Sequence, residues 1–202
     1  MTKAGEKTAA ALLERTIAAI ETGGEGAVKV ATIAEDAGVS VISLYHFYGN
    51  REGLIEAALA EMYRRTMAEF NETLAAGALA ATSCDDVRDL VQALGDLIFT
   101  AERAPFRRVR ARVIGSTAGR PGLAAQLAEA QVSSLAGFAD ALEQLQGRGV
   151  LRDDVPAREL ATWLSSLVFA RVVLEIAGDH VDGTSWDALT VQAMTEVILP
   201  RG

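Results

Sequence analysis

The chain has 202 residues, of which half are hydrophobic, and it carries a formal net charge of −8 at pH 7. This length allows one compact unit, or two closely packed ones, with enough core to need no disulfide or metal. One cysteine and two histidines exclude an internal disulfide and argue against a zinc site made of Cys and His ligands.

The beginning of the chain predicts an arm, a supporting helix and a loop. We expect residues 1–8 to form a short, solvated arm that carries two lysines. From Thr8 to Thr22, apolar residues recur with helical spacing, which indicates a helix with one buried face. The pair Gly23-Gly24 ends this helix and begins a loop that reaches Val28.

The stretch from Val28 to Ala58 has the pattern of a helix-turn-helix. A short helix is expected from Val30 to Ala37, ending at Gly38, because glycine tolerates the left-handed conformation that closes a helix. Ser40 is a suitable N-cap for a second short helix, Val41 to Phe47. A tight turn between two such helices is typical of a motif whose second helix lies in the DNA major groove.

A longer helix is predicted to begin at Arg51, with Asn50 as its N-cap, and to end near Gly77. Three short core helices of another all-α protein would explain the apolar residues equally well. The aromatic residues and the pair Asn50-Arg51 favour DNA binding, since packing alone gives no reason for them. Four strings follow one another in order: Ile33-Ala34, Ala37-Gly38-Val39-Ser40, Leu44-Tyr45, and Asn50-Arg51-Glu52 ahead of Leu54. Together they resemble the N-terminal domain of TetR-family transcriptional repressors.

The rest of the chain predicts further helices and no convincing strand. A loop of small residues from Ala76 to Ser83 precedes a helix, and Ser83 with Asp86 has the spacing of a capping box. Three prolines open later helices, and the last helix spans about Ser185 to Leu199. The expected helices begin near Ser83, Pro105, Pro121, Pro156 and Ser185, and end near Arg103, Gly115, Gly147, Ile176 and Leu199. The fold class is therefore predicted as all-α with about nine helices.

The resemblance implies two domains: residues 1–62 as a three-helix helix-turn-helix domain, and residues 63–202 as a helical ligand-binding and dimerisation domain. It implies a homodimer through residues 155–199, in which we expect a charge at Leu167 or Val168 to disrupt assembly. The N-terminus lacks the apolar centre of a signal peptide, and Arg171 and Glu175 break the longest apolar run. We expect a cytoplasmic protein without a membrane span.

Carried over residue by residue, the resemblance assigns DNA contacts to the helix-turn-helix. Tyr45 and Arg51 match positions that bind phosphates in the family, and an arginine offers a wide fork for this role. Ser43 can hydrogen-bond a base edge, whereas Val41 can only touch a thymine methyl group. The predicted DNA-binding residues are Lys29, Thr32, Ser40, Val41, Ser43, Tyr45, His46 and Arg51.

The charge of the first domain keeps an alternative open. Residues 1–62 carry five Lys or Arg side chains against nine Asp or Glu side chains. Ile42 and Phe47 of the second short helix are interpreted as core residues. The alternative is a helical ligand-binding or scaffold protein whose DNA binding is weakened or lost.

Six arginines form a second charge anomaly: Arg103, Arg107, Arg108, Arg110, Arg112 and Arg120. On a helix, Arg103, Arg107 and Arg110 share one face. We interpret the cluster as an ion-pair network with the acidic first domain, ahead of a site for an anionic ligand. Arg171 and Glu175, four residues apart, are expected to form a partly buried pair.

The resemblance also implies an effector, a small and largely apolar molecule that releases a repressor from its operator. Apolar pockets favour aromatic and flexible side chains, so the candidate lining is Met67, Phe70, Leu94, Phe99, Val113, Phe138 and Trp163. The long helix from Arg51 and the helix from Phe106 to Val113 are expected to connect the domains. No phosphate loop, nucleophile elbow, metal motif or histidine dyad is visible in the sequence, so we expect neither an enzyme nor a cofactor.

Overall fold

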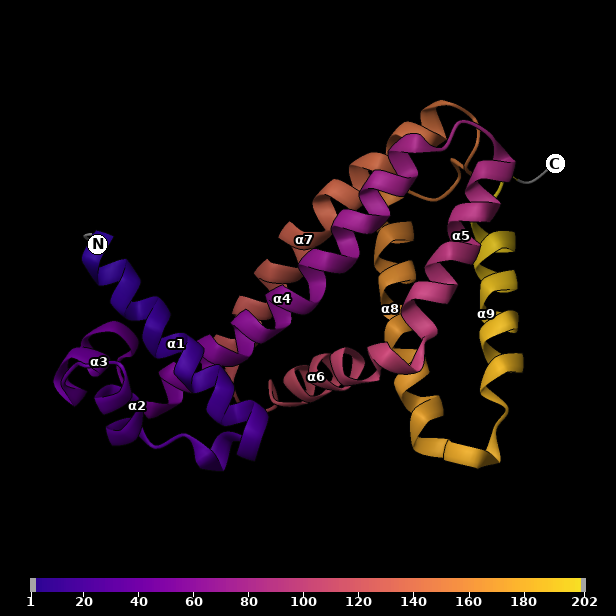
Figure 1. The fold of residues 1–202 in the computed structure, drawn as a ribbon. Coiled ribbons are helices and arrows are strands. Elements are labelled where there is room, and N and C mark those ends of the chain that lie inside the picture. Colours follow the sequence, from indigo (N-terminus) through magenta and orange to yellow (C-terminus); the bar gives the residue numbers. More distant parts are fainter. Residues whose placement is uncertain (1–2, 201–202) are drawn as a thin grey trace.

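The computed structural model describes residues 3–200, apart from the side chains of residues 69–74. Within this part the chain is all-α, without a strand, as predicted (Figure 1). The α-helices are α1 (Lys3–Gly23), α2 (Val30–Asp36), α3 (Val41–Tyr48), α4 (Arg51–Ala80), α5 (Cys84–Phe99), α6 (Ala104–Gly115), α7 (Pro121–Gly147), α8 (Ala157–Ala177) and α9 (Gly183–Ile198). Three single turns of 3-10 helix join them: η1 (Glu25–Ala27), η2 (Ala101–Arg103) and η3 (Gly178–His180).

Local hydrogen bonds set the boundaries of the helix-turn-helix. Gly38 has a φ of 68°, the left-handed conformation expected after α2. The Ser40 hydroxyl accepts from the Ser43 amide at 3.1 Å, and the Asn50 side chain accepts from the Gly53 amide at 2.9 Å, so both predicted N-caps are confirmed. The capping box of Ser83 and Asp86 at the start of α5 is also present.

The first three helices and the beginning of α4 surround a common apolar core. Leu12 and Ile20 of α1, Leu44 of α3, and Leu54 of α4 are all 0% exposed. Each lies on the inward stripe of its helix, so burial fixes how the short helices α2 and α3 sit against α1. Short helices have little stability of their own, and this packing is what holds α3 in place.

The remaining helices form a longer body around α4 and α7. Figure 1 shows α4 leaving the helix-turn-helix and running beside α7, while α5 lies beside α9. The short helix α6 packs against both α4 and α8. Phe138, Leu123 and Leu145 of α7 and Met67 of α4 are buried where these helices meet. The predicted boundary between residues 62 and 63 falls inside α4, which is continuous there.

Three expected boundaries were wrong. The helix α1 begins at Lys3, so the residues expected as a solvated arm are helical from there on; Glu6 in its first turn suits the positive end of the helix dipole. The helix α4 continues past Gly77 to Ala80, which shortens the expected loop. A Cβ atom on Gly77 would lie 2.4 Å from the Leu90 side chain, so this glycine serves close packing rather than helix termination. The helix α5 ends at Phe99, before the expected Arg103.

The expected pair of Arg171 and Glu175 was also wrong. Arg171 instead reaches Asp187 of α9, with 2.8 Å between Nε and Oδ1. Glu175 pairs with Arg107 of α6. Residues four apart on a helix are neighbours, but here each finds a partner on another helix.

Among the described residues, Ala157–His180 alone is long and apolar enough to cross a membrane, by length and composition only. Core helices of water-soluble proteins also meet this criterion. The two charged side chains in its middle, Arg171 and Glu175, are paired with α9 and α6. The segment is thus tied to its neighbours through polar contacts.

Candidate nucleic-acid interface and ligand cavity

The second helix of the helix-turn-helix, α3, has one face exposed to solvent. Ile42 is 83% exposed and Tyr45 is 41% exposed, and His46 is exposed beside them. Ile42 was expected in the core, and this expectation was wrong. Its spacing of three from Tyr45 and four from His46 places all three on one helical face, a signal that the sequence already contained. Phe47 does pack against the core, as expected.

Ser40, the N-cap of α3, and Ser43 within α3 have different roles. The Ser40 hydroxyl accepts from the Ser43 amide and donates to the Ser43 hydroxyl oxygen at 3.2 Å. Ser40 is therefore engaged in capping, while Ser43 keeps its own hydroxyl proton for a donor role. Val41 and Ser43 are half-buried. Base contacts by these residues stay a prediction.

Tyr48 fastens α3 to α1. Its hydroxyl donates to the Ala9 carbonyl at 2.7 Å, and burial raises the pKa of the Tyr48 phenol. The phenol therefore stays protonated as a donor at neutral pH. Sequence reasoning assigned no role to this residue, because its partner lies 39 positions away in the chain.

Arg51 holds the loop between α1 and α2. Its Nε donates to the Val28 carbonyl at 3.0 Å, and one terminal nitrogen donates to the Glu25 carbonyl at 2.6 Å. The other terminal nitrogen remains for the predicted phosphate contact. Lys29 and Thr32 lie exposed at the start of α2, next to this loop. The predicted contacts of these three residues with DNA stay predictions.

Arginines from outside residues 1–62 neutralise much of the acidic charge of the first domain. Glu14 and Glu61 pair with Arg65, and Glu25 and Glu52 pair with Arg120. Arg64 also pairs with Glu61. With these three arginines, the folded domain has eight basic side chains beside its nine acidic ones. The linear sequence thus exaggerates the charge that a DNA backbone would meet.

Arg120 joins the helix-turn-helix to α7. Its terminal nitrogens lie 3.0 and 2.6 Å from the two carboxylate oxygens of Glu25, and its Nε lies 2.6 Å from Glu52. The hydrogen bond from Arg120 is the main reason that the pKa of Glu25 is lowered. The expectation of an ion-pair network with the acidic domain is thus confirmed for Arg120. It was wrong for Arg107, which pairs with Glu175, and for Arg110, which faces a cavity.

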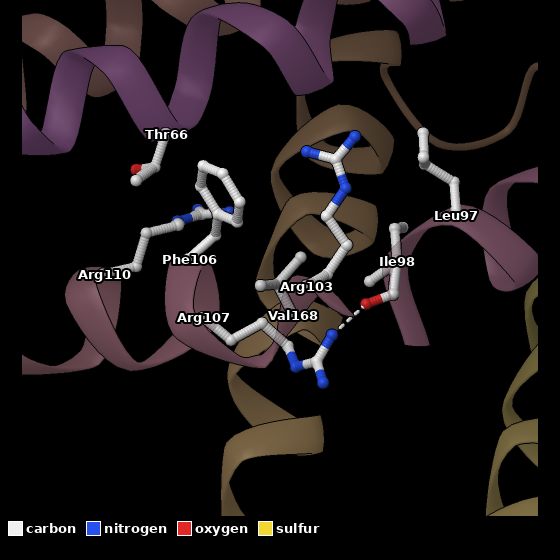
Figure 2. A pocket seen from close by; sticks show the side chains of 8 residues that line it. All are labelled: Thr66, Leu97, Ile98, Arg103, Phe106, Arg107, Arg110 and Val168. Carbon is white, nitrogen blue, oxygen red and sulfur yellow. Dashed lines mark hydrogen bonds between the residues drawn. The ribbon is translucent and has the colours of Figure 1, made fainter. Parts of the chain in front are cut away.

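The cavity lies between α4, α5, α6 and α8 and is shown in Figure 2. Its lining is Thr66, Leu97, Ile98, Arg103, Phe106, Arg107, Arg110 and Val168. The cavity has a volume of about 50 Å³. Val168 is 5% exposed and faces this cavity, and the effect of a charge placed there stays a prediction.

The residues predicted to line an effector pocket are not gathered in this cavity. Met67, Leu94, Val113 and Phe138 are buried in the core. Phe99 packs edge-on against Trp186 and borders a groove between α5 and α9, while Trp163 borders another depression on α8. Phe70 lies outside the residues whose side chains are described. Apolar composition alone could not separate lining from core, and ligand contacts by these residues stay a prediction.

A second crevice adjoins the cavity on the side of the first domain. It is lined by Ile17 and Glu21 of α1, Met62, Arg65 and Thr66 of α4, and Pro105, Phe106 and Val109 of α6. Thr66 and Phe106 therefore border both spaces. Across the described residues, no group of three His, Cys, Asp or Glu side chains could hold a metal ion.

Comparison with known proteins agrees with this geometry. Residues 12–58 match the family model of bacterial regulatory proteins, tetR family. No curated protein sequence matches the chain.

Among solved structures, the chain is similar to a TetR-family transcriptional regulator from Mesorhizobium loti, with a TM-score of 0.72, 16% identity, and coverage of 98% of this chain and 100% of that one. A TetR-family regulator from Rhodococcus sp. has a TM-score of 0.65 and 21% identity, with coverage of 96% and 99%. A transcriptional regulator from Saccharomonospora viridis in complex with choline has a TM-score of 0.62 and 18% identity, with coverage of 97% and 100%. Residues 12–58 thus have the sequence of a tetR-family helix-turn-helix domain, and the chain has the fold of TetR-family regulators along nearly its whole length.

Proposed function

We propose that the protein is a dimeric repressor that binds an operator in the cytoplasm and leaves it when a small molecule binds. It acts as a regulator, without enzymatic activity of its own. The observation that carries this proposal is the outward face of α3, where Ile42, Tyr45 and His46 are exposed on a helix fixed by Ser40 and Tyr48. Core packing does not explain why these side chains are exposed, whereas insertion of α3 into a major groove does.

Binding to the DNA that flanks the gene tests this proposal directly. Fluorescence anisotropy with that DNA should give saturable binding, competed weakly by unrelated DNA. Tyr45→Phe should weaken binding to all sequences alike, because a phosphate contact carries no base information. Ser43→Ala should change the preference among operators by about 1 kcal/mol or more. Absence of binding, with the protein folded by circular dichroism, would favour the alternative of a ligand-binding protein that has lost its operator.

Dimerisation is supported by an apolar face on the last helices. Val173 and Ile176 of α8 are 69% and 82% exposed, and Leu189 of α9 is 64% exposed. Val173 and Ile176 are three residues apart on one helix and share a face, and exposed apolar patches mark contact surfaces. We propose that this face, within residues 155–199, meets the same face of a second copy around a two-fold axis, so that the operator is a pseudo-palindrome.

Sedimentation at micromolar concentration tests the dimer. Ile176→Glu should shift the protein to a monomer, since a two-fold axis places the introduced charge in the interface twice. Val132→Glu is the matched control, because Val132 is 61% exposed on α7 and lies outside this face. A wild-type monomer, or a dimer unchanged by Ile176→Glu, would contradict the proposed interface.

The cavity between α4, α5, α6 and α8 is the proposed effector site. A similar regulator was solved in complex with choline, which supports a small-molecule effector for this chain. An effector can change DNA affinity only if it prefers one placement of the helix-turn-helix domains. Thr66 and Phe106 border both the cavity and the crevice next to Ile17 of α1. Movement of Phe106 is therefore the proposed link between effector and DNA.

A further inference from the structure

Three arginines line the cavity, Arg103, Arg107 and Arg110, and they differ in their interaction partners. Arg107 is 2% exposed and fully engaged: it pairs with Glu175 and donates to the carbonyls of Ile98 and Thr100. Figure 2 shows the bond from Arg107 to Ile98. Arg103 lies over the ring of Phe106, with its Cζ 5.3 Å from the ring centre.

Arg110 is the exception among them. It is 3% exposed, its hydrogen bond to the Ser165 hydroxyl is long at 3.3 Å, and its other polar neighbour is the Tyr63 hydroxyl. Its Nε is buried without a hydrogen-bond partner. Among the described residues, no carboxylate lies within ion-pair distance of Arg110. Burial lowers the pKa of the Arg110 guanidinium, and Tyr63 offsets only part of this shift.

Two aromatic rings partly compensate the positive charge of Arg110. Its Cζ lies 4.9 Å from the centre of the Phe169 ring and 5.8 Å from that of Tyr63. Such contacts recover less free energy than the burial of an unpaired charge costs. The guanidinium therefore retains both an unsatisfied donor and an unbalanced charge at the cavity wall.

The rest of the lining is mostly apolar. Leu97, Ile98, Phe106 and Val168 surround the space, and the Thr66 hydroxyl already donates to the Tyr63 carbonyl at 2.8 Å. A ligand that fits must bring one negative charge for Arg110 and an apolar body for the remainder. Guanidinium groups match carboxylates in shape and bind them through paired hydrogen bonds.

We propose that the effector is a small organic carboxylate, held through its carboxylate group by Arg110. This inference rests on the proposed function in taking the cavity as the effector site, and it adds a carboxylate to the small, largely apolar molecule expected from the sequence. A single charge suffices, because Arg107 is already balanced by Glu175. The small free volume of the cavity selects compact acids, with Phe106, which is 46% exposed, as the outer wall.

Isothermal titration calorimetry with sodium hexanoate, benzoate and phenylacetate tests the ligand class. Hexan-1-ol and hexylamine are the controls, because they share the apolar body of hexanoate but lack its charge. The wild-type protein should bind at least one of the three acids, and hexanoate at least tenfold more tightly than either control. If none of the acids binds, or if the alcohol or the amine binds as tightly as hexanoate, the inference is wrong.

Two variants test the residue. Arg110→Met removes the charge and keeps the length, and it should weaken binding of the acids at least tenfold while binding of hexan-1-ol is kept or improved. Arg112→Met is the matched control, because Arg112 is exposed on the same helix; it should leave all affinities unchanged. Arg110→Lys keeps a charge but not the fork, so it should retain part of the acid affinity, and this variant decides the question if Arg110→Met does not fold. Acid binding unchanged in the variant that folds would overturn the assignment.

Calorimetry separates this inference from the proposed function. The titration needs no DNA, so binding of acids can be measured even if the protein binds no operator. If the protein binds its operator but none of the three acids, the proposed function as a regulator would stand and only the carboxylate effector would be refuted. If the acids bind but do not change the affinity for the operator, the carboxylate site would be confirmed and its role as the effector site would be refuted.

Discussion

Replacing Arg120 by alanine should weaken the contact between the helix-turn-helix and the start of α7. Arg120, which precedes α7, contacts two carboxylates of the first domain at once, Glu25 in η1 and Glu52 in α4. The carbonyl of Glu25 in turn accepts from Arg51. Arg120→Ala therefore removes a direct tie between α7 and the loop that precedes the supporting helix α2.

The size of the effect follows from exposure. The side chains of Arg120 and Glu25 are 22% and 32% exposed, so their paired hydrogen bonds keep much of the roughly 1.5–3 kcal/mol expected for charged groups. The side chain of Glu52 is 47% exposed, and solvent reduces its share to below about 1 kcal/mol. We expect Arg120→Ala to lower the free energy of unfolding by about 2 kcal/mol.

Urea titration of Arg120→Ala, Glu25→Ala and the double variant measures the coupling between the two residues. The coupling energy should be about 1–2 kcal/mol, because the two side chains are in direct contact. Arg112→Ala, on the exposed side of α6, should change the stability by less than about 0.5 kcal/mol. A coupling energy near zero, or an equal loss in the Arg112 control, would refute the tie between the domains.

The coupling should also depend on pH in one direction. The pKa of Glu25 is lowered from 4.5, mainly by the hydrogen bond from Arg120. A lowered carboxyl pKa contributes stability that is fully present above the unfolded value and is lost as the pH falls through the folded value. The difference in stability between wild type and Arg120→Ala should therefore be constant near neutral pH and shrink below pH 4.5. A difference that grew in acid would contradict this assignment.

Three further outcomes are expected. Ile42→Glu should abolish operator binding in anisotropy while leaving the thermal midpoint unchanged, because the side chain is 83% exposed and the charge would face DNA phosphates; a lower midpoint would mean that Ile42 packs. Leu44→Ala should cost about 2–5 kcal/mol in urea titration, since Leu44 is 0% exposed in the core under α3, and a loss under about 1 kcal/mol would show that the site collapses around the gap. The slope of log K against log salt should be about −5, from about six phosphate contacts per dimer at roughly −0.9 each; a slope of about −10 would require basic residues beyond Lys29, Arg51 and one further lysine of each subunit.

The sequence alone predicted most of the fold, because helix boundaries depend on residues close together in the chain. Ser40 and Asn50 cap their helices with bonds to amides three residues ahead, and the box of Ser83 and Asp86 spans the same distance. Prolines mark the starts of α6, α7 and α8 for the same local reason. The helix-turn-helix was recognisable since its turn, caps and apolar spacing all lie within one short stretch.

The errors in boundaries had a tertiary cause. Gly77 has the local properties of a helix stop, but α4 continues through it, and the absent side chain leaves room for Leu90 of α5. Ile42 has the composition of a core residue, but the core below α3 is filled by Leu44, and the helical phase turns Ile42 outward. Composition gives the tendency of a side chain to be buried, and only packing decides which face is covered.

The partners of the charged residues were settled by the tertiary structure. Arg120 meets Glu25 across 95 positions of sequence, and Arg107 meets Glu175 across 68. The sequence placed Arg103, Arg107 and Arg110 on one face, but it could not say that Arg107 would pair with Glu175 and that Arg110 would find no carboxylate among the described side chains. That difference depends on where α8 ends up relative to α6, because an ion pair forms only within a few ångströms and helix packing sets such distances.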